Sequence, residues 1–571
     1  MNDSKIQVGL KKLPIHLQSS QNRILIKGGK VVNDDRAALS DVYIEDGVIK
    51  QVGLQLTIPG GVRVIDATGK LLLPGGVDVN TRFQMAINGM QASDDFYSGT
   101  RAAIAGGTTT ISKLNLWHLT HSCPVDCVHA SKGASMLKMF EQYRNCADAK
   151  ACCDYALHVT VPSYDEHVEK EMTTLVNEHG VNSFQLFLSY PDRILNDVEL
   201  FKAMMKCKEL GAIAMVHAEN GKLIEILEEQ TYQSGIRGPE GHLYSHPEEA
   251  EIEATSRVIT LAAGAACPLL VSHMTSTEAV RVLADARRRG HIVLGEVTAA
   301  ALAKNGYEYL DKRWQHAAAF VVSPPLRLDR SAPERLMQCL ATEELELTSS
   351  DHCTFRVEQK AVGKDDFRKI PHGVNGVEER MSVVWEKGVV TGMMDPCKFV
   401  AVTSSNAAKI FNLYPRKGRI DVGSDADVVV WNPQETRVIS AGTHHQNTDV
   451  NIFDGLCCHG VPCTVVSGGR VVVEDGEVRV TQGAGRYLTR APFAPYVYDR
   501  LKAYEESHAI KPIQRDPYTG PVSTLEFSSN PAATENASAN GLSSGPKPRS
   551  PTRGGGRNMQ ECQTATDDST V

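Results

Sequence analysis

Several features that would assign this chain to a specialised class are missing from its 571 residues. It has no run of about 18 apolar residues, which a membrane-spanning helix requires. Residues 1–22 lack the continuous apolar segment of a secretory signal peptide. A net charge of −8 over this length is too small to suggest a nucleic acid or a membrane surface as the main partner. We therefore expect a soluble, cytoplasmic protein.

A disulfide framework is also missing, although the chain contains fourteen cysteines. Some are adjacent, as in Cys152-Cys153 and Cys457-Cys458, and others stand alone within apolar runs. Short secreted domains space their cysteines differently, because each one needs a partner at a fixed distance. The pattern here indicates buried thiols in a reducing compartment.

Short strands with tight turns occupy both ends of the folded part. From residue 23 the chain reads RILIKGGKVVN and DVYIEDGVIKQVG, in which EDG lies between two alternating runs and is typical of a hairpin. The same pattern of short apolar runs separated by turn residues recurs in SDADVVVWNP and GVPCTVVSGGRVVVEDGEVRV. The pattern predicts one small β-sandwich domain built from residues 23–75 and 411–490.

The middle of the chain, residues 76–410, alternates predicted strands with predicted helices. DYALHVTV precedes a helical segment, and VNSFQLFLSY, AIAMVHAEN, PLLVSHM and HIVLGEVTA continue the alternation. Gly180, Gly211 and Gly290 stand where glycine commonly ends a helix. Repeated β-α units over this length predict an α/β fold, a (β/α)8 TIM-like barrel. A doubly wound sheet is the alternative, but no GxGxxG turn follows a first strand.

The remaining segments are predicted from composition. Residues 1–22 read as a flexible extension, and 491–527 as a helix followed by an extended segment, for which the family resemblance given below implies a role in oligomerisation. Residues 528–571 contain no aromatic residue and are dominated by Ser, Asn, Gly, Pro and Thr. Such a stretch cannot bury enough apolar surface to fold, so we expect a disordered regulatory tail.

Polar residues follow several of the predicted barrel strands, where a barrel of this kind places its active site. His217 lies in AMVHAEN, His273 in LVSHMTS and Asp351 in TSSDHCTF. Two histidines and an aspartate form a partial metal shell. The apolar run KLLLPGGVDV reads as a single buried strand, and Asn80 and Arg82 follow it. Neither an amide nor a guanidinium is a useful ligand for a catalytic transition metal.

Longer motifs resemble one family in particular. HAENG, GPEGH, SPPLR, SDHCTF, NGVEERMSVVWEKGVV and GSDADVVVW are similar to dihydropyrimidinase and its relatives, which include the collapsin response mediator proteins. The resemblance covers roughly residues 23–520. It implies an amidohydrolase barrel in which the enzymes hold two zinc ions with His-x-His, a carboxylated lysine, two later histidines and an aspartate.

The resemblance implies that this metal site is dismantled. Asn80 and Arg82 stand at the His-x-His positions, and Gln185 stands at the bridging lysine. His217, His273 and Asp351 remain, so we expect no catalytic metal; zinc on these three residues is the weak alternative. Because a bare buried carboxylate is costly, we expect Arg82 to form an ion pair with Asp351. The substrate-holding positions of the family correspond to Tyr190, Ser323 and Asn375.

Two functions compete on this resemblance. The first is a non-catalytic scaffold of the collapsin response mediator type, a homotetramer that also forms hetero-oligomers with related proteins. Such a scaffold binds tubulin or other cytoskeletal proteins and acts in microtubule regulation, neuronal development and axon guidance. The alternative is a cyclic-amide hydrolase, a dihydropyrimidinase or hydantoinase with a reduced metal site. The loss of three of six metal ligands favours the scaffold.

The predicted tail carries two short motifs. Ser550 begins Ser-Pro-Thr-Arg, which fits a site for proline-directed kinases. The last three residues, Ser569-Thr570-Val571, match the type of C-terminus that PDZ domains capture. We therefore expect kinases, and a PDZ protein, among the partners of this segment.

Overall fold

The computed structural model describes residues 23–87, 90–115, 135–509 and 511–523. Residues 23–509 belong to one unit, and residues 511–523 form a separate irregular segment whose side chains are all exposed. No helix in these ranges combines the length and apolarity needed to cross a bilayer. The domain boundaries given above stay predictions, because barrel and sheets pack together within this one unit.

Eight parallel strands form the barrel, and their order in space is their order in the chain. They are β8 (Gly76–Thr81), β11 (Thr108–Asn115), β12 (Asp154–Thr160), β13 (Ser183–Phe187), β14 (Ile213–His217), β15 (Leu269–Met274), β16 (Val293–Thr298) and β17 (Leu347–Ser349). A bridge between Thr81 and His352 brings the first and last strands together, so the sheet is nearly closed. The predicted barrel is confirmed, and the doubly wound alternative is wrong.

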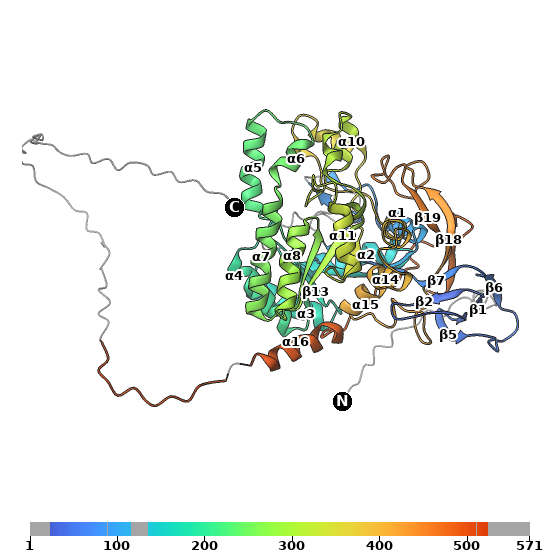
Figure 1. Ribbon diagram of the computed structural model, residues 1–571, viewed down its shortest axis with the longest axis horizontal. Helices are drawn as coiled ribbons and strands as arrows, with labels where there is room; N and C mark the ends of the chain where they lie inside the picture. Colours follow the sequence, from blue (N-terminus) through green and yellow to red (C-terminus); the bar gives the residue numbers. More distant parts are fainter. Residues whose placement is uncertain (1–22, 88–89, 116–134, 510, 524–571) are drawn as a thin grey trace, which may run out of the picture. The chain divides into compact units, whose positions relative to one another are not determined.

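Helices cover the outside of the barrel (Figure 1). The main ones are α1 (Phe96–Ala105), α2 (Met136–Lys150), α3 (Glu166–Asn177), α4 (Asp197–Glu209), α5 (Gly221–Gln233), α6 (Glu240–Ser245), α7 (Glu248–Ala265), α8 (Thr277–Arg288) and α11 (Ala332–Ala341). Gly180, Gly211 and Gly290 follow α3, α4 and α8 with φ angles of 65°, 68° and 92°. These angles explain the glycines, because other residues rarely adopt them.

Shorter elements complete the barrel region. They are β9 (Ala86–Ile87), β10 (Met90–Gln91), α9 (Ala299–Ala303), η3 (Gly306–Leu310), α10 (Trp314–Ala319), α12 (Val357–Lys360), η4 (Ala361–Gly363), η5 (Phe367–Lys369), α13 (Arg380–Val384), η6 (Trp385–Val390), α14 (Pro396–Val400), η7 (Ala401–Ser405) and α15 (Asn406–Ile410).

Two further sheets form the predicted β-sandwich from both ends of the chain. One has the order β5 (Val48–Gly53), β4 (Asp41–Glu45), β1 (Arg23–Lys27), β6 (Arg63–Asp66). The other has the order β21 (Glu477–Val478), β20 (Arg470–Glu474), β19 (Cys457–Ser467), β18 (Val428–Val438), β7 (Leu71–Pro74), β2 (Lys30–Val32), β3 (Ala37–Leu39). The pairing of β7 with β18 joins the two chain ends (Figure 1). A shared apolar core that includes Ile24, Leu72 and Val466 stabilises the sandwich.

The run KLLLPGGVDV is divided between the two parts of the fold, so its interpretation as one strand is wrong. β7 belongs to the sandwich and β8 to the barrel, and Gly75 separates them. A Cβ atom at Gly75 would lie 2.0 Å from Thr109 Oγ1. Both strands are largely buried, and Leu71–Val79 reads as one mostly apolar run, which hides the corner between them.

A buried ion network connects the barrel to the sandwich. The Lys417 ammonium lies 2.7 Å from Asp154 Oδ2, at the start of β12, and 3.0 Å from Asp425 Oδ2, and it also contacts Asp427. Arg486 binds Asp154 and Asp425 from outside. The three carboxylates raise the pKa of Lys417 above its usual value, so it stays charged although it is buried. These carboxylates lie close enough together to hold a metal ion, but the ammonium already contacts all three.

The predicted C-terminal helix is α16 (Pro495–Ser507), and it packs on its own chain. Val497 and Leu501 are buried in a cluster with Ile213 and Leu270 of the barrel strands. The Tyr498 hydroxyl donates a hydrogen bond of 2.7 Å to the Ala212 carbonyl oxygen, just before β14. The helix therefore covers the amino-terminal end of the barrel, opposite the end that carries active sites in this architecture.

Candidate functional site

The six metal-site positions predicted from the sequence lie at or just beyond the carboxyl ends of barrel strands. Each is buried, with at most 3% of its surface exposed. The strand-borne residues are Asn80 on β8, Gln185 on β13, His217 on β14 and His273 on β15, and Arg82 and Asp351 follow β8 and β17. The barrel thus brings together residues that are up to 271 positions apart in the chain.

Arg82 and Asp351 form the ion pair expected from the sequence. Arg82 Nε lies 2.6 Å from Asp351 Oδ1, and both side chains are almost fully buried. Burial raises the pKa of Asp351 to about 6, because desolvation of the carboxylate outweighs the attraction of Arg82. Asp351 in turn raises the pKa of the guanidinium. A fixed cation therefore holds the carboxylate that a metal ion would otherwise bind.

The two histidines are part of a hydrogen-bond chain. Asn80 Nδ2 lies 2.9 Å from His273 Nδ1, His273 Nε2 lies 2.6 Å from His217 Nδ1, and His217 Nε2 lies 2.8 Å from Glu219 Oε2. An amide nitrogen can only donate, so each ring accepts at Nδ1 and donates at Nε2. Both imidazoles are then neutral, in agreement with a His273 pKa well below its usual value because of burial.

Other polar atoms around this chain remain unsatisfied. Among the described residues, neither Asn80 Oδ1 nor Gln185 Nε2 has a hydrogen-bond partner. Glu296, at the carboxyl end of β16, accepts from Ser349 and, at 3.4 Å, from Asn80 Nδ2. Burial raises the Glu296 pKa to about 8, so its neutral form is favoured at pH 7.

Sequence reasoning missed Glu219 and Glu296, although both carried a signal. Glu219 follows His217 by two residues in HAEN, and Glu296 lies in the strand-like LGEVT. An acidic residue at the carboxyl end of a predicted barrel strand is a reasonable site candidate. The pairing of Glu219 with His217, however, depends on the local backbone path after β14.

Three residues of the site have strained backbones. Tyr190, His273 and Asp351 have φ angles of 68°, 42° and 47°, in the left-handed region that non-glycine residues seldom adopt. Each such conformation costs about 1–3 kcal/mol and persists only where the surroundings enforce it. The surrounding structure therefore holds all three residues in conformations that they would not adopt on their own.

The predicted pocket residues Tyr190, Ser323 and Asn375 are only partly brought together. Ser323 interacts with the Tyr190 hydroxyl, and burial raises the pKa of Tyr190 to about 12. The Ser323 hydroxyl is also 3.0 Å from His372 Nδ1. Asn375 instead donates to Asn451 Oδ1 and accepts from the Ile452 amide, so its side-chain amide is used within the protein.

These residues do not fit a catalytic zinc ion. Zinc needs three protein ligands with free lone pairs, such as neutral imidazole nitrogens or carboxylate oxygens. Here all ring nitrogens of His217 and His273 take part in hydrogen bonds with each other, Asn80 or Glu219. The Asp351 carboxylate forms an ion pair with Arg82. Within the described ranges, the group of metal-binding residue types close enough to share an ion is Asp154, Asp425 and Asp427, which lies elsewhere. Ser550 and Ser569-Thr570-Val571 fall outside the described residues.

Replacing Arg82 with methionine should make stability depend more strongly on pH. Without the guanidinium, the Asp351 pKa should rise above about 6, further above its unfolded value of about 3.9. A carboxyl group whose pKa is higher in the folded than in the unfolded protein lowers the free energy of unfolding as the pH rises from the unfolded pKa to the folded pKa. Urea denaturation should therefore show a loss for Arg82→Met that grows from pH 6 to pH 8, towards about 3–5 kcal/mol.

The double variant Arg82→Met/Asp351→Asn is the control for this experiment. It removes both charges, so the additional pH dependence should disappear and much of the stability should return. An equal loss at pH 6 and pH 8 in the single variant would show that the ion pair is not the origin of the effect.

Comparison with known proteins agrees with this architecture. A sequence model of the Amidohydrolase family matches residues 71–472. The chain is 51% identical to Dihydropyrimidinase of Rattus norvegicus over 511 residues, which cover 89% of this chain and 96% of the relative. It is 49% identical to Dihydropyrimidinase-related protein 5 of Homo sapiens over 508 residues, covering 89% and 88%.

Solved structures give the same assignment. The crystal structure of dihydropyrimidinase from Brevibacillus agri NCHU1002 matches with a TM-score of 0.79 and 38% identity, covering 83% of this chain and 99% of that one. A D-hydantoinase from a Bacillus species matches with a TM-score of 0.78 and 37% identity, covering 82% and 99%. The chain therefore belongs to the amidohydrolase family, with dihydropyrimidinase and dihydropyrimidinase-related protein 5 among its relatives.

Proposed function

We propose that this chain is a non-catalytic, dihydropyrimidinase-like scaffold that acts in cytoskeletal regulation. The observation that carries the proposal is the buried ion pair of Arg82 with Asp351. Hydrolysis of a cyclic amide in this family depends on water whose pKa is lowered by a firmly held cation. A guanidinium bound to the remaining carboxylate repels a metal ion at that position and cannot itself coordinate water as a metal does.

The neighbouring residues support the same proposal. Asn80 and Gln185 supply neutral amides, and a glutamine has no amine to carry the bridging carbamate. His217 and His273 use their nitrogens in the chain that ends at Glu219. A metal ion would have to break this chain and overcome the charge of Arg82.

A cyclic-amide hydrolase is the second candidate. It is favoured by 51% identity to a dihydropyrimidinase and by the strained Tyr190, which still interacts with Ser323. Retained pocket residues are also explained by packing, because Ser323 binds His372 within the protein. The metal site therefore discriminates between the two candidates better than the pocket does.

The purified chain should contain no stoichiometric zinc and should not hydrolyse dihydrouracil or hydantoin. Elemental analysis and a turnover assay measure the two quantities directly. About two zinc ions per chain, or turnover in the usual enzyme range of roughly 1–1000 per second, would favour the hydrolase instead.

A restoration experiment gives the matched control. Asn80→His, Arg82→His and Gln185→Lys together should restore zinc binding, because they replace the cation and the two amides with ligands. Arg82→His alone should not, since it leaves Asp351 without its counter-ion and supplies a single new ligand. Zinc binding by the single variant would contradict the role assigned to Asn80 and Gln185.

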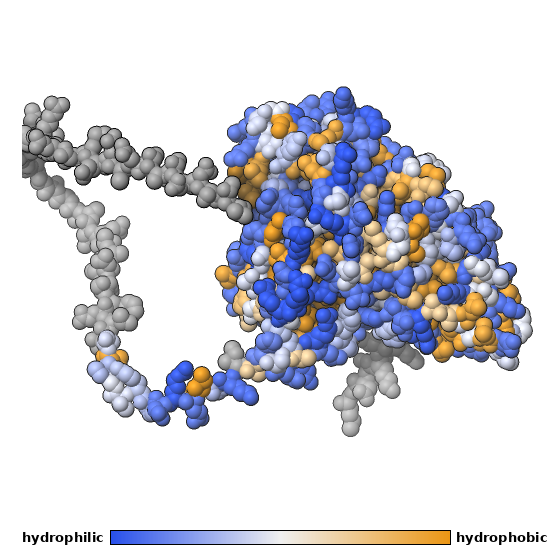
Figure 2. All heavy atoms as spheres, in the orientation of Figure 1, coloured by the Kyte–Doolittle hydropathy of each residue, from blue (hydrophilic) through white to orange (hydrophobic). Residues whose placement is uncertain are grey.

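The proposal includes assembly as a homotetramer and with related chains. Apolar side chains remain exposed on helices of the surface, including Ile226 on α5 and Met205 on α4. Figure 2 shows one face, on which apolar residues interrupt a mainly hydrophilic surface. Because Val497 and Leu501 of α16 fill the barrel end of their own chain, deletion of this helix would damage the fold as well as any interface.

A chain that ends at residue 525 should form tetramers in light scattering, and substitutions on the exposed face of α16 should reduce the molecular mass. Ala503 is exposed, so Ala503→Arg should disturb a subunit contact without unfolding the helix. The control is Lys138→Arg on α2. It replaces another exposed side chain, away from α16, and keeps its positive charge. A monomeric full-length chain would contradict the assembly proposal. If Ala503→Arg leaves the tetramer unchanged, α16 is not part of the subunit interface.

Tubulin, or another acidic cytoskeletal protein, is the proposed partner of residues 528–571. All four basic residues of this segment lie between Lys547 and Arg557. Phosphate on Ser550 would add about −1.5 to −2 charges among them. Ser550→Glu should therefore weaken tubulin co-sedimentation at low salt, and deletion of 528–571 should weaken it further, while Ser550→Ala serves as control. Unchanged binding after the deletion would place the partner on the folded part.

A further inference from the structure

A cavity with a volume of about 320 Å³ lies between the barrel and the seven-stranded sheet, away from the degenerate metal site. Val461 of β19, Val473 of β20 and Val478 of β21 line its apolar side. The segment before α13 and several of residues 437–445, which include the end of β18, supply most of the remaining lining. The volume is at the lower end of the usual range for small-molecule sites, about 300–1,000 Å³. The cavity therefore has room for a small ligand only.

The two carboxylates at this cavity are committed to protein partners. Both oxygens of Glu378 accept from His445, Oε2 from the backbone amide at 2.7 Å and Oε1 from Nδ1 at 3.0 Å. Glu379 is 1% exposed; its Oε1 accepts from Asn451 and Gln446, and its Oε2 is buried out of reach of a ligand. Burial, followed by repulsion from Glu378, also raises the pKa of Glu379 and so shifts it towards its neutral form. Neither glutamate therefore offers a free oxygen to a ligand.

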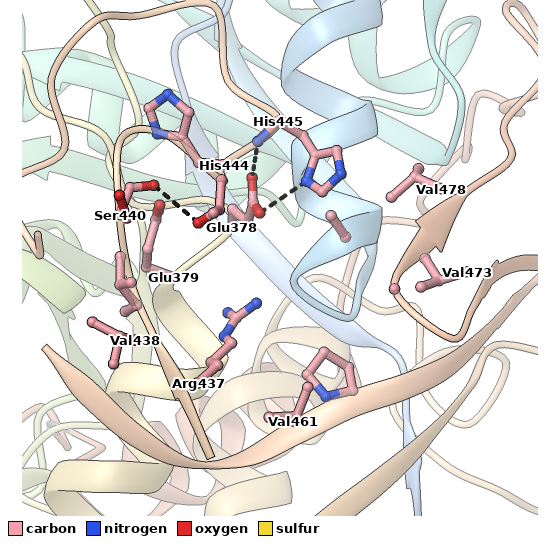
Figure 3. Close-up of a pocket in the computed structure, with 15 residues that line it drawn as sticks. Glu378, Glu379, Arg437, Val438, Ser440, His444, His445, Val461, Val473 and Val478 are labelled. Atoms are coloured by element: carbon pink, nitrogen blue, oxygen red, sulfur yellow. Dashed lines mark hydrogen bonds and ion pairs between the residues drawn. The ribbon is translucent and has the colours of Figure 1, made fainter. Parts of the chain in front are cut away.

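Arg437, in contrast, has a donor that a ligand can reach. Its Nη2 donates to the Ser382 hydroxyl at 2.9 Å and its Nε is buried, but its Nη1 is neither buried nor hydrogen-bonded among the described residues. No acidic side chain of these residues forms an ion pair with Arg437, and Glu378 contacts His445 instead. Figure 3 shows the guanidinium extending into the space between the lining residues, while the dashed lines from Glu378 lead to His445. The accessible charge in the cavity is therefore positive.

We propose that this cavity binds a short aliphatic monocarboxylate. The ligand carboxylate accepts from Arg437 Nη1, and its hydrocarbon chain packs against Val461, Val473 and Val478. The charge-assisted hydrogen bond orients the ligand, and the apolar wall supplies most of the affinity. A cationic ligand would meet the guanidinium without a free carboxylate to bind. An uncharged ligand would gain the apolar contacts but not the charge-assisted bond.

Two properties of the binding follow from this arrangement. The sign of the charge matters, because one cationic nitrogen is the polar group that the ligand reaches. The length of the chain matters as well: each methylene that enters the apolar part should tighten binding about fourfold, as expected for the burial of one CH₂ group. The lining residues take no part in the Arg82–Asp351 pair, so the proposal goes beyond the scaffold function and is tested separately from it.

A ligand series on the full-length chain, measured by isothermal titration calorimetry, tests the class of ligand. Hexanoate should bind saturably and about tenfold more tightly than hexanol or hexylamine, which carry the same chain without the negative charge. Butanoate, pentanoate and hexanoate should bind with stepwise increasing affinity. The proposal is overturned by no saturable binding of hexanoate, by equal binding of hexanoate and either analogue, or by equal binding of the three carboxylates.

Two pairs of variants locate the site. Arg437→Gln should weaken hexanoate binding about tenfold and leave hexanol binding unchanged. Its control is Arg470→Gln, which removes an arginine of β20 outside the lining and should change neither. Val438 lines the cavity and is 58% exposed, so Val438→Glu should fold and repel hexanoate, whereas the neutral Val438→Gln should not repel it.

Unchanged hexanoate binding in either Arg437→Gln or Val438→Glu would overturn the site. If Arg437→Gln fails to fold, the comparison of Val438→Glu with Val438→Gln decides, because a substitution at an exposed position does not disturb the core.

Discussion

The ion pair between Arg82 and Asp351 is the constraint on which the mouth of this barrel depends. Two charged groups are held at 2.6 Å in a region from which water is largely excluded. Such a pair is a poor source of net stability, because desolvation offsets most of the attraction. It nevertheless has to be complete, since either partner alone would be an uncompensated buried charge. The cation beside Asp351 is the Arg82 guanidinium, which belongs to the chain itself.

The neighbouring histidines adapt to the same change by hydrogen bonding. His217 and His273 share one proton position, Asn80 donates at one end and Glu219 accepts at the other. The adaptation is incomplete, as Asn80 Oδ1 and Gln185 Nε2 remain without partners in the described part. His273 and Asp351 also have left-handed backbones, so the site combines unsatisfied polar atoms with a strained main chain.

Charged groups serve different purposes at the other interfaces of the fold. Lys417 satisfies Asp154, Asp425 and Asp427 between barrel and sandwich, so that cluster is complete and structural. In the cavity beside β18, Glu379 and Arg437 each keep an unpartnered atom. The Lys417 cluster is therefore a fully paired buried network, whereas Glu379 and Arg437 are only partly satisfied.

The sequence alone determined the barrel and the sandwich from both chain ends, because periodicity is a local property. Its resemblance to a known family singled out Asn80, Arg82 and Gln185. The same resemblance placed Arg82 and Asp351 at one site, and the cost of a bare buried carboxylate then predicted their ion pair. The corner at Gly75 could not be predicted, because the two buried strands read along the sequence as one mostly apolar run. Other features depend on side chains that meet only after the chain has folded. They are the roles of Glu219 and Glu296, the hydrogen bond of Asn375 to Asn451 and the cavity beside Glu379. Tertiary structure decided them because hydrogen-bond partners are chosen by distances of about 3 Å, which spacing along a sequence does not specify.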